Sequence, residues 1–113
     1  MSLARLFILR GREPHPCDDL QVWGPFMDNI AGRQVAQGHV AGYAVSTVFL
    51  GIDHGTDPSR PLVFETVVFD DHGERIETSA RLASTNAEAL QNHRQAEADV
   101  RYAAQVARQL ARA

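Results

Sequence analysis

Two polar residues, Asp53 and His54, follow directly on the longest run of strand-forming residues in the chain, which starts at Ala44. A carboxylate and an imidazole are side chains that commonly transfer protons in enzymes. Successive residues of a strand point to opposite sides, so a hydrogen bond between these two side chains is not implied. The pair is therefore a candidate site, and the alternative is a turn formed by Asp53 beside a solvated His54.

Glu65 lies within a second strongly apolar stretch, Leu62–Phe69. An ionised carboxylate inside a covered strand carries a desolvation penalty of several kcal/mol unless it is paired. Arg33 is the partner that we expect for it. In a functional role Glu65 would contact a ligand or act as an acid–base group. The alternatives to that role are a structural ion pair and an exposed position at a sheet edge.

These residues define the predicted site. Asp53, His54 and Glu65 are the candidates for catalysis, which requires that they converge in one cleft. The predicted binding surface adds a tryptophan and an arginine and comprises Trp23, Arg33, Asp53, His54 and Glu65. Trp23 is the only tryptophan of the chain, and its alternative role is to fill the core.

Metal and nucleophile chemistry find little support in the sequence. Histidines and acids are frequent in the predicted loops, as in Asp70–His72, but none has the spacing of a zinc site. His93 falls on the apolar stripe of a predicted helix, where a satisfied core histidine is expected. The chain has no lysine and a single cysteine, Cys17, so lysine chemistry and an intrachain disulfide are both excluded. We expect no metal and no cofactor.

The composition is that of one globular domain spanning residues 1–113. Hydrophobic residues make up 44% of the chain and the net charge is −3. This charge argues against general nucleic-acid binding, which needs a basic surface. The apolar N-terminal stretch is interrupted by Arg5 and ended by Arg10, unlike a signal peptide, and no segment approaches the roughly 20 apolar residues of a membrane span. We expect a cytoplasmic protein without membrane association.

The first part of the chain predicts a strand and a short helix. The strand is expected over residues 4–10, and Pro14 and Pro16 should hold the residues after it in an extended loop. Asp18–Asp19 provides a suitable N-cap for the helix. Pro25 should end this helix or divide it, because proline removes a helical hydrogen bond and clashes with the preceding turn.

The middle of the chain predicts two antiparallel hairpins. A strand over residues 33–40 should turn at Ala41–Gly42, where glycine supplies the positive φ of a tight turn, and lead into the central strand. That strand is apolar on both faces, which is typical of an interior strand covered on both sides. The strand Leu62–Phe69 should turn at Asp70–Gly73 into a half-exposed edge strand, Arg75–Leu82.

The last element predicted is a long helix over residues 84–112. Thr85 and Glu88 have the spacing of a capping box, and no glycine or proline interrupts the residues that follow. Apolar residues recur at intervals of three and four positions, which gives one apolar stripe rich in alanine. At about 1.5 Å per residue this helix is longer than the strands, so its end should extend beyond the sheet and could contact another subunit.

Together these elements predict an α+β fold. We expect an antiparallel sheet of four to five strands, with a short N-terminal helix and a long C-terminal helix packed on one face.

Several segments combine into a recognisable set: Pro16-Cys17-Asp18-Asp19-Leu20, Trp23, Arg33-Gln34-Val35-Ala36, Val45-Ser46-Thr47-Val48-Phe49-Leu50-Gly51-Ile52-Asp53-His54 and Leu62-Val63-Phe64-Glu65-Thr66. Through residues 14–95 the chain resembles a group of small uncharacterised proteins from phages, prophages and GC-rich bacteria. It departs from that group in the loop after His54, which there is glycine-rich, and in its longer C-terminal helix. The resemblance implies an origin in a mobile element and transfers no catalytic residue.

Three functions remain open from the sequence. The leading one is a non-catalytic phage- or prophage-type accessory protein that binds a host protein or a small ligand, for example in host takeover or anti-defence. The second is a small hydrolase or nucleotide-acting enzyme that uses Asp53, His54 and Glu65. The third is a structural assembly protein that forms a homo-oligomer through its C-terminal helix.

Overall fold

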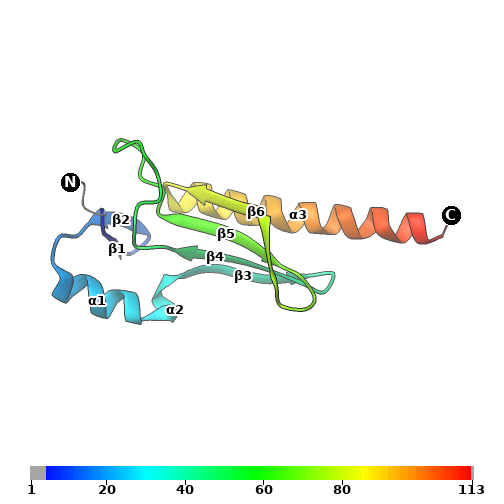
Figure 1. Ribbon diagram of the computed structural model, residues 1–113, viewed down its shortest axis with the longest axis horizontal. Helices are drawn as coiled ribbons and strands as arrows, with labels where there is room; N and C mark the ends of the chain where they lie inside the picture. The colour runs from blue at the N-terminus through cyan, green and yellow to red at the C-terminus, as the bar shows by residue number, and fades with distance from the viewer. Residues whose placement is uncertain (1–4, 113) are drawn as a thin grey trace.

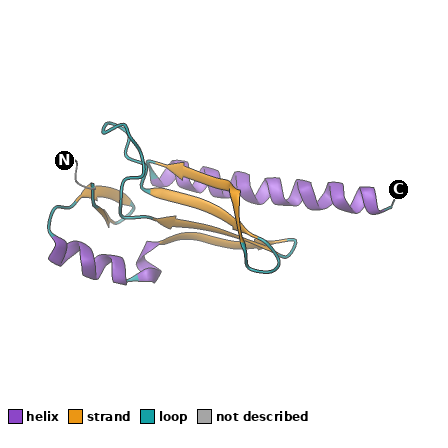
Figure 2. Ribbon diagram, viewed as in Figure 1, coloured by secondary structure: helices purple, strands orange, loops and turns teal. Residues whose placement is uncertain are grey.

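The computed structural model describes residues 5–112 and has the predicted α+β fold, in which a long helix crosses one face of an antiparallel sheet (Figure 1). The elements are β1 (Phe7–Arg10), β2 (Glu13–Pro16), α1 (Leu20–Asp28), α2 (Ile30–Arg33), β3 (Gln34–Val40), β4 (Tyr43–Phe49), β5 (Phe64–Phe69), β6 (Arg75–Ala83) and α3 (Asn86–Ala111). The main sheet has four strands in the order β3-β4-β5-β6, and β1 and β2 form a separate hairpin (Figure 2).

The N-terminal strand is confirmed from Phe7 onwards, and Ala4 lies outside the described residues. The predicted extended loop after it is wrong, because Glu13–Pro16 pairs with β1 as a second strand. Pro14 and Pro16 are compatible with this pairing because β2 is an edge strand, where a missing N–H can face away from the neighbour.

The helical segment is longer than predicted. Asp19 is its N-cap, and its Oδ1 accepts a hydrogen bond of 2.9 Å from the backbone N–H of Gln21. Pro25 lies inside α1 without ending it, and the break comes at Asn29 instead. The Asn29 side chain caps α2 by accepting from the N–H of Gly32. Arg33 belongs to this helix, so β3 begins at Gln34 and not at the predicted residue 33.

The hairpin between β3 and β4 is confirmed, with positive φ angles of 53° at Ala41 and 86° at Gly42. The prediction that the central strand is covered on both faces is wrong. In β4, Val45, Thr47 and Phe49 are fully buried beneath α3, whereas the residues between them are only half-buried. The reason is that helix covers only one side of the sheet (Figure 2).

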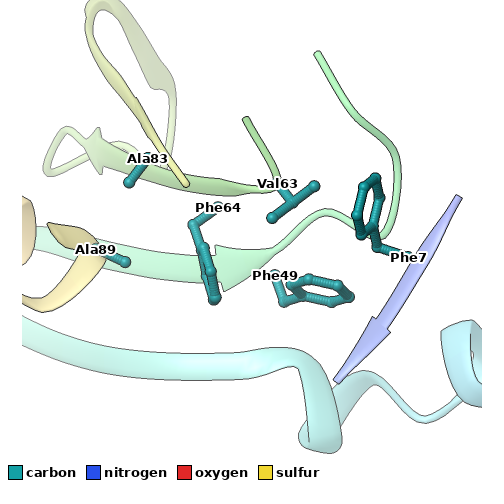
Figure 3. Packing of buried hydrophobic residues seen from close by; sticks show 6 residues of the cluster. All are labelled: Phe7, Phe49, Val63, Phe64, Ala83 and Ala89. Atoms are coloured by element: carbon teal, nitrogen blue, oxygen red, sulfur yellow. The ribbon is translucent and has the colours of Figure 1, made fainter. Parts of the chain in front are cut away.

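A cluster of large side chains closes the end of the sheet next to the N-terminal hairpin (Figure 3). The rings of Phe49 and Phe64 meet edge-on at a centroid distance of 5.4 Å, and Phe26 of α1 meets Phe49 in the same way at 5.8 Å. Phe7 of β1 and Ala89 of α3 complete this contact. The hairpin, the sheet and the long helix therefore share one core.

The C-terminal helix begins as predicted. Thr85 is the N-cap, and its Oγ1 accepts from the backbone N–H of Glu88 at 3.1 Å. The first half of α3 buries Ala89, His93 and Ala96 against the sheet, while Leu110 near its end is 70% exposed. The C-terminal part extends beyond the sheet (Figure 1), and among the described residues no helix is both long and apolar enough to cross a membrane.

Gly51 is required where β4 ends, because its φ is +75° and a Cβ there would lie 2.2 Å from Sδ of Met27. Gly51→Ala should lower the free energy of unfolding by about 3 kcal/mol, measured by urea denaturation followed through Trp23 fluorescence. Gly73→Ala is the matched control, because Gly73 has a φ of +77° and open space around it; backbone strain alone should cost about 1 kcal/mol there. Equal losses in the two variants would contradict the steric role of Met27.

Candidate functional site

Asp53 is engaged in holding the loop between β4 and β5. Its Oδ1 accepts hydrogen bonds from the backbone N–H groups of Gly55 at 2.7 Å and Leu62 at 2.9 Å. Arg5 donates to its Oδ2 at 3.2 Å, and the Asp53 side chain is only 5% exposed. His54 contributes its backbone N–H to the same loop, while its side chain is exposed. The carboxylate therefore has a structural function, and only the imidazole faces solvent.

Glu65 is paired with Arg75 and not with Arg33. Two hydrogen bonds, of 3.2 and 2.9 Å, join the guanidinium of Arg75 to the two carboxylate oxygens of Glu65, and a third of 2.9 Å joins it to Glu77. Hydrogen bonding to Glu65, followed by that to Glu77, raises the pKa of Arg75. The predicted pairing fails because Glu65 and Arg75 lie on neighbouring strands, whereas Arg33 ends α2, before β3.

Trp23 anchors α1 to the end of the sheet. Its Nε1–H donates to the backbone oxygen of Gly51 at 3.0 Å, and the N–H of Phe7 donates to the same oxygen at 2.9 Å. The structure thus brings Trp23 and Asp53 together around the Gly51 turn, where both hold backbone in place. Glu65 lies on the sheet away from this turn, so the five predicted residues do not share one site.

Sequence reasoning missed a buried polar network between the sheet and α3. The hydroxyl groups of Thr47 and Thr66 are 2.6 Å apart, and Thr47 Oγ1 lies 2.9 Å from Nδ1 of His93. On the other side of the imidazole, Nε2 of His93 is 3.7 Å from a carboxylate oxygen of Glu97. Thr47 and Thr66 face each other in register on β4 and β5 beneath the helix.

This network has the group types of a hydroxyl nucleophile with a base and an acid. Thr47 is 0% and Thr66 is 1% exposed, so the hydroxyl groups are enclosed between sheet and helix. What the arrangement does is satisfy polar groups that would otherwise be costly to bury, and bind α3 to both central strands. The prediction that His93 is a satisfied core histidine is confirmed. Its partners Thr47 and Thr66 could be identified only from the register of β4 and β5.

Three of the grooves on the surface of residues 5–112 are well formed, and none of these three is lined by Asp53, His54 or Glu65. We call the largest the helix groove; it has a volume of about 700 Å³ and lies between the C-terminal half of α3 and the sheet. Its main apolar lining residues are Tyr43, Val68, Ile76, Val100, Ala103 and Ala107. Arg81 and Asp99 form an ion pair on its wall, and hydrogen bonds from Gln95 and then Arg81 lower the pKa of Asp99.

Within residues 5–112, no cluster of three or more histidine, cysteine, aspartate or glutamate side chains could hold a metal ion. Comparison with protein-family models, with curated proteins and with solved structures gave no match.

Replacing Asp53 and His54 one at a time tests whether this pair has a structural role in the loop or is a site for chemistry or binding. Asp53→Ala should lower the free energy of unfolding by about 2 kcal/mol, because two loop N–H groups and Arg5 lose their acceptor. His54→Ala should change it by less than about 0.5 kcal/mol, since the imidazole is exposed. Urea denaturation of both variants measures this, and an Asp53→Ala protein of unchanged stability would contradict the structural role.

Thr47→Val tests the buried network with little change of volume. It leaves Nδ1 of His93 and the hydroxyl of Thr66 without their shared partner, so we expect a loss of about 1 to 3 kcal/mol in denaturation experiments. Thr78→Val, at an exposed position of β6, is the matched control and should stay within about 0.5 kcal/mol of the parent protein. Similar values for both variants would show that the hydroxyl network does not hold the helix.

Proposed function

We propose that the protein is a non-catalytic binding protein and that the helix groove is its ligand surface. The observation that carries this proposal is the groove itself, an open apolar channel of about 700 Å³ beside a helix that extends beyond its own sheet (Figure 1). Binding sites for small molecules and for apolar protein segments commonly have this size and this lining.

The engagement of the candidate carboxylates supports the same proposal. Asp53 accepts two hydrogen bonds from its own loop and one from Arg5, and Glu65 is held by Arg75. A general base must be within reach of the proton that it removes from a substrate. These carboxylates are occupied by structural partners instead, which favours binding over the hydrolase or nucleotide-acting alternative.

The lining of the groove indicates what it could hold. Tyr43 and Ile76 from the sheet face Val100 and Ala103 from α3, so most of the contact surface is apolar. The alanines leave room for side chains of a ligand because their own are short. A small apolar ligand or an apolar segment of a host protein fits this lining, and the resemblance to phage and prophage proteins favours the host protein.

Filling the groove provides the test. Ala103→Trp places a large side chain in the groove, and it should weaken binding of the apolar fluorophore anilinonaphthalene sulfonate by about tenfold, or about 1.4 kcal/mol. Ala98→Trp is the matched control, because Ala98 is an exposed alanine of the same helix outside the groove. Fluorescence titration and thermal melts of both variants measure binding and folding. Equal affinity in the two variants would overturn the proposal.

A further inference from the structure

The two edges of the main sheet differ in charge. β6 forms one edge and carries Arg75, Glu77 and Arg81. β3 forms the other edge over Gln34–Val40, and none of its residues is charged at neutral pH with histidine neutral. Edge strands present unpaired backbone N–H and C=O groups, and charged side chains commonly protect them from pairing. β3 has a bulge between Gln34 and Ala36, and from Ala36 to Val40 it offers a regular hydrogen-bonding edge without charged side chains.

Three arginines form a row along α3. Arg94, Arg101 and Arg108 are seven residues apart and exposed, so they lie on nearly the same side of the helix at intervals of about 10.5 Å. Within residues 5–112, none of them lies within 4 Å of a carboxylate. This distinguishes them from arginines such as Arg75, whose guanidinium is held by acids of the protein itself.

Two arginines of the row, Arg101 and Arg108, lie on the β3 side of the helix. Glu97, one turn before Arg101, approaches Gly38 so closely that a Cβ at Gly38 would lie 2.6 Å from its carboxylate. A groove of about 500 Å³ then continues between the end of β3 and α3. Its lining residues are His39, Val40, Ala41, Arg101, Ala104, Gln105 and Arg108. The uncharged strand edge and the unpaired arginines thus border one surface.

We infer that this surface binds an extended acidic segment of a partner protein. The segment adds to the sheet as a further strand against β3, and its acidic side chains reach Arg101 and Arg108. Strand addition explains why the edge is uncharged. The acidic side chains of the segment supply the negative partners that these arginines do not have within the protein. This surface adjoins the helix groove, and Ala41, Ala104 and Arg108 border both. The inference rests on the strand edge and Arg101, which do not line the helix groove, so it does not depend on the function proposed above.

The dimensions agree with this arrangement. Seven residues of β3 span about 23 Å, and the row from Arg94 to Arg108 spans about 21 Å along the helix axis. Side chains on one face of an added strand recur every 6.6 Å or so, which the long arginine side chains can follow. The carboxylate of Glu97, on the same helix, is directed to His93 and Gly38.

The positive charge of the arginines and the open backbone edge of β3 favour an acidic polypeptide over a second copy of the chain or a nucleic acid. A second copy that paired through the same helix end would bring Arg101, Arg108 and Arg112 of each copy together, and residues 100–113 contain no acid to balance them. Nucleic acid could satisfy the arginines, but it cannot continue a strand, and the net charge of −3 opposes it. A polypeptide satisfies both the edge and the arginines.

A synthetic peptide of about eight residues that alternates valine and glutamate is the probe, since it has the period of a strand. It should bind the full-length protein in calorimetric titration. Arg101→Gln combined with Arg108→Gln should weaken binding about tenfold. Arg10→Gln combined with Arg12→Gln removes the same two charges from exposed positions in and beside the turn between β1 and β2, and this control should leave the affinity unchanged. An unchanged affinity in the double variant would overturn the inference.

Two further probes separate strand addition from plain charge attraction. A peptide of the same sequence with alternate backbone nitrogens methylated keeps its charge but loses the donors that an added strand needs, so it should bind about tenfold more weakly. Equal binding of this peptide would overturn strand addition. Single-stranded oligothymidine of equal charge should bind more weakly than the glutamate peptide, and tighter binding of the oligonucleotide would overturn a protein partner in favour of nucleic acid.

Discussion

The hydrogen bond between Thr47 and His93 fixes how the long helix lies on the sheet. Apolar contact alone tolerates small shifts along a stripe rich in alanine, because short side chains give little resistance to sliding. A buried donor and acceptor tolerate much less, since misalignment leaves both groups unsatisfied in a dry interface. Thr47 is bonded to His93 and also to Thr66. These bonds fix the position of α3 along the two central strands. The helix groove, the arginine row and the free C-terminal end all follow from that position.

A second constraint acts at the far end of the central strand, where polar groups that look available for chemistry are used to build the fold. The backbone oxygen of Gly51 accepts from both Trp23 and Phe7, and Asp53 accepts from Gly55 and Leu62. These bonds join the N-terminal hairpin, α1 and the long loop to one short segment. The carboxylate after this strand is therefore explained by the need to end the strand and start a loop, to which His54 contributes its backbone N–H.

Local signals predicted the elements well, and long-range partners were harder to predict. The N-cap positions Asp19 and Thr85 and the Ala41–Gly42 turn depend on neighbours within a few residues, so the sequence contains all the information needed. The Thr47–Thr66 contact depends on which strands are adjacent. The partner of Glu65 depends in addition on a register that one bulge interrupts between β5 and β6. The sequence also could not show that one sheet face lacks a covering layer, because half-buried and fully buried strands differ little in composition.

The arginines of the chain fall into groups with different surroundings. Arg5, Arg60, Arg75 and Arg81 are matched by carboxylates, and these pairs connect loops and strands to one another. Arg94, Arg101 and Arg108 differ because the helix carries them along its outer side, next to an edge strand without charge. Arg108 lies in the last turn of α3, where a cation stabilises the helix dipole. Arg94 and Arg101 lie further from that end, where the dipole has little effect. The acidic, extended partner inferred above would pair with the row and with the strand edge at the same time.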